Sequence, residues 1–100
     1  MESNHQNYIQ PNQTLYVNNL NDKIKIDELK ENLFHLFSEF GDIISIVTKK
    51  NAKMRGQAFI IFKDSISAKK AKLSLNHSIF LGKELNIDYS KNPSKILSSF

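Results

Sequence analysis

Six segments of this chain carry the hydrophobic spacing of strands or helices, and their order restricts the fold more than any other feature. Four alternate apolar and polar residues, as strands do, and two place apolar residues three and four positions apart, as helices do. In chain order they are a strand, a helix, two strands, a helix and a strand, over residues 14–20, 26–40, 43–48, 55–62, 65–75 and 85–89. This order predicts an α+β fold of the ferredoxin-like β-α-β-β-α-β type, a sandwich of a four-stranded antiparallel sheet with both helices on one face.

Local signals add detail to this prediction. Gly41 follows the first helical segment, where a C-terminal cap is expected. The second helical segment begins near Ser65 or Ser67, and either could serve as its N-terminal cap. In the strand over residues 43–48, Ile44 and Ile46 alternate with Ser45 and Val47, so Ile44 and Ile46 are expected to share one face.

Length and composition exclude several classes of protein. One hundred residues fit a single domain of two layers. There is no cysteine, and His5, His35 and His77 lack the spacing of metal ligands, so we expect neither a metal nor another cofactor. No apolar run approaches the roughly 20 residues of a membrane span, and the N-terminal residues lack the apolar core of a signal peptide. We therefore expect no membrane partner.

Basic and acidic residues occupy different parts of the sequence. The net charge is +4. Six of the fourteen basic residues form two groups, one of Lys49, Lys50, Lys53 and Arg55 with no acid between them and one of Lys23 and Lys25. Four of the ten acids fall elsewhere, in the first helical segment: Asp27, Glu28, Glu31 and Glu39. Separate surfaces of opposite charge favour a polyanionic partner on one side. The alternative is a lysine-rich loop that serves only solubility.

One face of the predicted sheet carries residues suited to nucleic-acid bases. The strands over residues 14–20 and 55–62 are expected side by side at the centre, with Tyr16 and Phe59 on the face that the helices leave open. Each ring can stack a base, and the amides of Asn18 and Gln57 can bond base edges. The alternative is that both rings lie beneath a C-terminal helix. This face offers neither paired carboxylates nor a nucleophile with a base, so we expect no enzyme and no small-molecule substrate.

Several stretches resemble a known family. Residues 55–62, Arg-Gly-Gln-Ala-Phe-Ile-Ile-Phe, resemble the signature of the RNA recognition motif (RRM), with Gln57 in place of the usual second ring. Residues 15–20, Leu-Tyr-Val-Asn-Asn-Leu, are similar to the spliceosomal A and B-double-prime proteins of the U1 and U2 small nuclear ribonucleoproteins (snRNPs). Two later stretches are similar to the same proteins: Lys-Met-Arg-Gly-Gln-Ala-Phe-Ile-Ile-Phe-Lys and Tyr-Ser-Lys. The Gln that departs from the general RRM signature is the residue that these proteins carry at that position. The similarity runs without gaps from about Gln13 to Ile96.

The resemblance implies a nuclear, sequence-specific RNA-binding protein that recognises a hairpin loop of U2 or U1 small nuclear RNA in pre-mRNA splicing. It implies an RRM over residues 13–92. Residues 1–12 lack periodicity and are expected to form a flexible N-terminal arm, and the amphipathic pattern of residues 93–100 predicts a short C-terminal helix. In the B-double-prime branch, a leucine-rich-repeat protein of the U2 snRNP A-prime type pairs with the first helix. The alternatives are an RRM that binds protein and a general single-stranded RNA-binding RRM outside the spliceosome.

Carried over residue by residue, the resemblance assigns RNA contacts to a defined set of side chains. Bases are contacted by Tyr16, Gln57 and Phe59, and base edges are hydrogen-bonded by Asn18, Asn19 and Asp22. The RNA backbone and loop are met by Lys23, Lys25, Lys49, Lys50, Lys53 and Met54. Arg55 is implied to read the base pair that closes the RNA loop, a task suited to a planar guanidinium. The site is completed by Lys83, Tyr89, Ser90, Lys91 and Asn92.

Two residues of the last predicted strand depart from the family pattern. Asp88 stands where relatives carry a Gln that contacts a base, and Asn86 replaces a basic residue. A carboxylate at position 88 repels phosphate but can accept a hydrogen bond from the amino group of cytosine or guanine. These departures alter the RNA preference that the family pattern implies.

Overall fold

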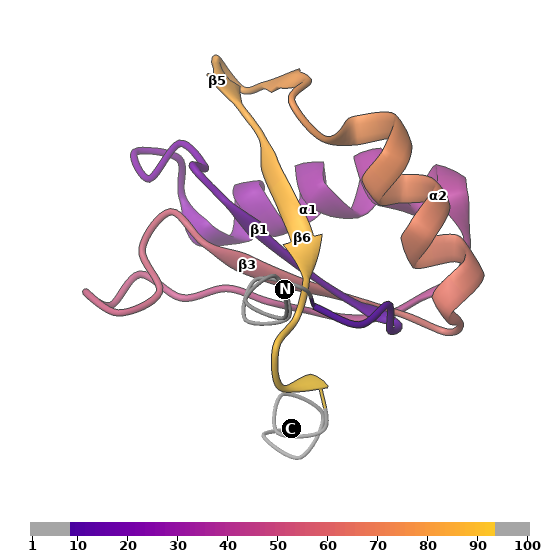
Figure 1. The fold of residues 1–100 in the computed structure, drawn as a ribbon. Coiled ribbons are helices and arrows are strands. Elements are labelled where there is room, and N and C mark those ends of the chain that lie inside the picture. Colours follow the sequence, from indigo (N-terminus) through magenta and orange to yellow (C-terminus); the bar gives the residue numbers. More distant parts are fainter. Residues whose placement is uncertain (1–8, 94–100) are drawn as a thin grey trace, which may run out of the picture.

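The predicted succession of strands and helices is present in the computed structural model, which describes residues 9–93 (Figure 1). The elements in chain order are β1 (Thr14–Asn18), α1 (Ile26–Phe37), the short 3-10 helix η2 (Ser38–Phe40), β2 (Ile43–Val47), β3 (Ala58–Phe62), α2 (Ser65–Leu75), β4 (Ile79–Phe80), β5 (Lys83–Glu84) and β6 (Asn86–Tyr89). Four of these strands form an antiparallel sheet in the order β2-β3-β1-β6. The predicted ferredoxin-like α+β fold is confirmed.

The two helices cover one face of this sheet, and the core lies between the two layers (Figure 1). Leu15 of β1 pairs with Ile60 of β3 and Tyr89 of β6, and all three are buried against the helices. Leu33 and Phe37 of α1 have no exposed surface and pack into the same cluster. A large apolar side chain buried in this way contributes roughly 1.5–3 kcal/mol relative to an exposed one.

The opposite face of the sheet is called the open face here. It carries Tyr16 and Asn18 of β1, Phe59 of β3 and Asp88 of β6. These residues point away from the helices because each alternates along its strand with a core residue. β1 and β3 are neighbours at the centre of the sheet, so the open face has Tyr16 and Phe59 at its middle.

In β2 the observed faces differ from the predicted ones. The pairing of β2 with β3 changes register between Ile43 and Ser45. Ile43 and Ile46 therefore both pack against the core, while Ile44 is 54% exposed. The prediction that Ile44 shares a face with Ile46 is wrong, because an irregularity of this kind inserts one residue and breaks the alternation.

The N-terminus of α2 is capped by Asp64 and not by the serines that follow it. The backbone N–H of Ser67 donates to Asp64 Oδ1 at 2.8 Å. This hydrogen bond, with a smaller contribution from Ser67's side chain, holds the pKa of the Asp64 carboxyl below its ordinary value. Asp64 is extended, as N-cap residues are, whereas Ser65 already belongs to the helix.

The predicted N-terminal arm is partly visible. Ile9 packs against the core, and Asn12 Nδ2 donates to the carbonyl of Ser90 at 3.0 Å. Asn12 Oδ1 also accepts from the N–H of Thr14. Residues 1–8 of the arm and residues 94–100 of the predicted C-terminal helix lie outside the described residues.

Candidate nucleic-acid interface

Two aromatic rings lie side by side at the centre of the open face. Tyr16 and Phe59 are direct partners in the β1–β3 register, and their ring centroids are 5.4 Å apart with an interplanar angle of 44°. Both residues are half-buried, so part of each ring reaches the surface. This pair, called the aromatic platform below, is the arrangement that stacking of unpaired bases requires.

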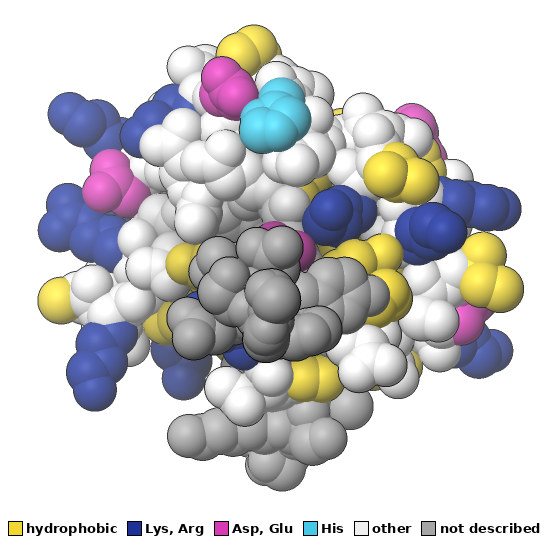
Figure 2. Space-filling view, in the orientation of Figure 1, with side chains coloured by type: hydrophobic (Ala, Val, Ile, Leu, Met, Phe, Trp, Pro, Cys, Tyr) yellow, Lys and Arg dark blue, Asp and Glu magenta, His cyan; other side chains and the backbone are white. Residues whose placement is uncertain are grey.

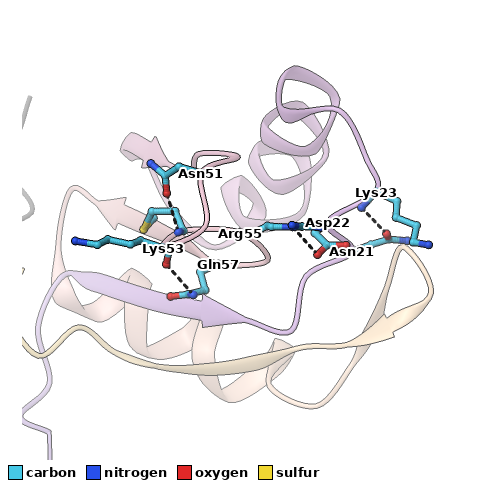
Figure 3. Close-up of polar contacts among 8 residues, drawn as sticks. Asn21, Asp22, Lys23, Asn51, Lys53, Arg55 and Gln57 are labelled. Atoms are coloured by element: carbon cyan, nitrogen blue, oxygen red, sulfur yellow. Dashed lines mark hydrogen bonds and ion pairs between the residues drawn. The ribbon is translucent and has the colours of Figure 1, made fainter.

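Gln57 joins the platform to the loop that precedes β3. The Tyr16 hydroxyl donates to Gln57 Oε1 at 2.8 Å. Gln57 Nε2 in turn donates to the carbonyl of Lys53 at 3.1 Å (Figure 3). An amide oxygen has two lone pairs and an amide nitrogen two hydrogens, so Gln57 retains capacity for a ligand. Gln57 therefore holds Tyr16 in place, a role that its sequence position did not predict.

The basic loop, residues 49–55, has internal order. The backbone N–H groups of Met54 and Arg55 donate to the carbonyl of Asn51, and Asn51 Oδ1 accepts from the same Met54 N–H (Figure 3). Thr48 Oγ1 closes the base of the loop by donating to the carbonyl of Gln57 at 2.7 Å. The loop is thus a folded turn that presents its lysines to solvent.

The loop after β1 is attached to the basic loop at two points. Arg55 Nε donates to Asp22 Oδ2 at 3.1 Å (Figure 3), and the N–H of Leu20 donates to the carbonyl of Gly56 at 3.0 Å. The side chains of Arg55 and Asp22 are 60% and 39% exposed, so solvent screens this ion pair and it adds little stability. Its effect is to orient the guanidinium, whose two terminal nitrogens make no hydrogen bond or ion pair within residues 9–93.

The lysines predicted to meet RNA backbone gather beside these two loops. They are all exposed: Lys23, Lys25, Lys49, Lys50 and Lys53. In Figure 2, dark blue side chains cluster at the left of the molecule, where the two loops lie in Figure 1. The cations therefore adjoin one end of the open face, where they can attract a phosphate backbone.

A cavity of about 730 Å³ extends from the platform along β6. Its walls include Tyr16, Asn18, Phe59, Asp88, Lys91 and Asn92. The volume falls within the roughly 300–1,000 Å³ of small-molecule sites. The open face is therefore hollowed beside the rings and can receive a base together with part of its sugar.

Comparison with known proteins agrees with this geometry. The RNA recognition motif model matches residues 15–86. The chain belongs to the RNA recognition motif family. The structure of this RRM is similar to the crystal structure of RNA Binding Protein PG1, with a TM-score of 0.65, 26% sequence identity, and coverage of 78% of this chain and 93% of that one.

Curated relatives place this RRM more narrowly. It is 49% identical over 84 residues to the probable U2 small nuclear ribonucleoprotein B'' of Schizosaccharomyces pombe, covering 84% of this chain and 76% of that protein. It is 51% identical over 88 residues to the U1 small nuclear ribonucleoprotein A of Drosophila melanogaster (88% and 41%), and 51% identical over 90 residues to the U2 small nuclear ribonucleoprotein B'' of Dictyostelium discoideum (90% and 37%). The chain spans about two fifths of the length of these last two relatives. The predicted membership of the A and B-double-prime family is confirmed.

Two predicted RNA contacts of this RRM are not presented on its open face. Tyr89 pairs with Leu15 on the helix side, where it is 9% exposed and Lys72 Nζ lies 5.4 Å from its ring centroid. The alternation that puts Asp88 on the open face puts Tyr89 on the other. Ser90 is 2% exposed, because its N–H donates to Thr14 and its carbonyl accepts from Asn12. Tyr89 and Ser90 are therefore buried rather than displayed on the open face, although both border the cavity beside β6.

The small hairpin of β4 and β5 is tied to the end of β1 by two asparagines. Asn19 Nδ2 donates to the carbonyl of Glu84 at 2.8 Å, and Asn21 Nδ2 donates to that of Leu81 at 3.1 Å. Asn21 Oδ1 also accepts from the N–H of Lys23 (Figure 3). Asn21, which sequence analysis did not single out, thus shapes the loop that presents Lys23. Lys83, another predicted contact, is exposed on this hairpin.

Other kinds of site receive no support from the described structure. Within residues 9–93 no three His, Asp or Glu side chains are grouped so that they could hold a metal ion. None of the helices in that part of the chain is both long and apolar enough to cross a membrane.

Proposed function

We propose that this RRM binds the hairpin loop of a small nuclear RNA, U1 or U2, as a nuclear component of a spliceosomal snRNP in pre-mRNA splicing. The observation that carries the proposal is the aromatic platform, two half-exposed rings 5.4 Å apart at the centre of the open face. The identity of about one half to relatives named U1 A and U2 B'' supports the choice of RNA class. The RNA-binding domain is proposed to span residues 13–92.

The roles proposed for individual groups follow from their positions. Bases of the loop stack on Tyr16 and Phe59, and their edges meet the amides of Asn18 and Gln57. The exposed lysines of the two loops neutralise phosphates. Arg55 already makes an ion pair through Nε with Asp22. This leaves its terminal nitrogens for a bidentate contact with the guanine of the closing base pair.

A second, protein partner is proposed for α1. The outer side of this helix is largely unoccupied by the rest of the domain: Phe34 is 48% exposed and lies edge-on to His35, and Glu28 and Glu31 are also exposed. We propose that a leucine-rich-repeat protein of the U2 snRNP A-prime type docks here. RNA and protein would then bind to opposite layers of the domain without competing.

Crosslinking in nuclear extract tests the RNA assignment. The protein is irradiated in extract, bound RNA is recovered and sequenced, and the crosslinked peptide is mapped. We expect a U1 or U2 hairpin loop attached at Tyr16 or Phe59. Phe59→Ala should reduce recovery, whereas Leu73→Ala, a change of an exposed apolar side chain on α2 outside both proposed surfaces, should not. Recovery of diverse RNAs with no enrichment of either small nuclear RNA would overturn the assignment.

A further inference from the structure

Asp88 stands in the same row of the open face as the aromatic platform. Tyr16 is its direct partner across β1 and β6, and Phe59 is the partner of Tyr16 on the other side. Asp88 is exposed and borders the 730 Å³ cavity. A base stacked on Tyr16 would therefore have one edge facing the Asp88 carboxylate.

This carboxylate is little used by the protein itself. Asp88 Oδ1 accepts the N–H of Tyr89 at 2.7 Å, and no other hydrogen bond of the side chain is made within residues 9–93. The ion pairs of that part of the chain join Arg55 to Asp22 and His77 to Glu84, so none neutralises Asp88. A carboxylate oxygen has two lone pairs, and both oxygens can still accept hydrogen bonds.

The four RNA bases differ in what they can offer to two carboxylate oxygens. Guanine carries two adjacent donors on its Watson–Crick edge, N1–H and the N2 amino group. Adenine and cytosine place an acceptor nitrogen next to their amino group, and uracil places carbonyl oxygens on both sides of N3–H. An acceptor facing a carboxylate is repelled, and so is a phosphate. Guanine is therefore the base whose donors match both oxygens, as a charge-assisted bidentate pair requires.

We propose that the cavity beside β6 binds an unpaired guanine, stacked on Tyr16, whose N1–H and N2–H donate to the Asp88 carboxylate. The inference rests on the proposed binding of RNA to the open face and adds the identity of one base. Lys91, on the same cavity wall, is placed to receive the phosphate of that nucleotide. Asp88 is then a specificity-determining residue of this protein.

The test is selection of hairpins with a randomised loop by three proteins at one salt concentration. They are wild type, Asp88→Asn and, as a control with the same change of charge, Asp42→Asn. Asp42 is exposed before β2, at the end of that strand opposite the basic loop. Wild type and Asp42→Asn should select guanine at one loop position. For Asp88→Asn the enrichment of guanine over the other bases at that position should fall at least about tenfold, which corresponds to the loss of one bidentate base contact. Preferences at the other positions should stay unchanged.

Inosine at the selected position gives a second readout. It lacks the N2 amino group, so it should weaken binding by wild type and have little effect on Asp88→Asn. If Phe59→Ala abolishes binding but Asp88→Asn selects the same loop as wild type, the guanine assignment is overturned and the proposed function stands. If wild type binds no hairpin, or Phe59→Ala binds as well as wild type, the proposed function and this inference fail together.

Discussion

The hydroxyl of Tyr16 allows a one-atom test of how the aromatic platform is held. Tyr16→Phe keeps the ring but removes the donor that lies 2.8 Å from Gln57 Oε1. The bond is partly buried and joins two residues that are 41 positions apart in sequence. Its loss should lower the free energy of unfolding by about 0.5–1.5 kcal/mol. In a domain of this size, each kcal/mol lowers Tm by about 4–8 °C.

A double-mutant cycle isolates this bond. Wild type, Tyr16→Phe, Gln57→Leu and the double variant are unfolded in urea, and their free energies of unfolding are compared. Gln57→Leu also removes the bond to the Lys53 carbonyl, but that loss occurs with and without the Tyr16 hydroxyl and cancels. The coupling energy should be about 0.5–1.5 kcal/mol. Additive effects, within about 0.3 kcal/mol, would refute the view that Gln57 holds Tyr16 in place.

Three further predictions concern the loops and the α2 cap. Hairpin affinity should fall steeply with salt, with a log–log slope of about −0.7 for each phosphate neutralised, and a flat titration would exclude backbone contacts by the basic loop. Arg55→Lys should cost about 1–3 kcal/mol more on the preferred hairpin than on one with its closing pair reversed, whereas Lys50→Ala should weaken both equally; an equal loss for Arg55→Lys would make Arg55 a phosphate contact. Asp64→Ala should lower Tm at neutral pH. Because the folded-state pKa of Asp64 is lowered, its contribution is complete above the ordinary pKa and disappears as pH falls through the lowered value, so a Tm difference independent of pH would contradict the cap.

The arrangement of the platform was predictable because it depends on alternation and strand order alone. Tyr16 and Phe59 each sit between core residues in their strands, and the ferredoxin-like order makes those strands neighbours. The same alternation places Tyr89 with Ile87 on the helix side, although the family resemblance assigned it to the RNA site. The position of the Tyr89 ring thus follows the strand alternation, while its role in RNA binding stays a prediction.

Other features depend on contacts that no local pattern encodes. Asp22 and Arg55 are 33 residues apart, and the chain of bonds from Tyr16 through Gln57 to Lys53 exists only once β1 and β3 have paired. The exposure of Ile44 follows from a shift in the pairing of β2 with β3, which the sequence of β2 does not show. These features determine how the site is held, while the periodicity determines where it lies.

The central claim is that the open face binds RNA through its aromatic platform. The most direct measurement is the Kd of wild type, Phe59→Ala and Phe34→Ala for the same U1 or U2 hairpin at matched salt. Phe59→Ala removes one stacking ring and should weaken binding by about 1–3 kcal/mol, with the fold intact. Phe34→Ala removes a ring that is 48% exposed on α1 and should leave the Kd unchanged. Equal affinities for wild type and Phe59→Ala would contradict the claim, because the sheet could not then be the RNA surface.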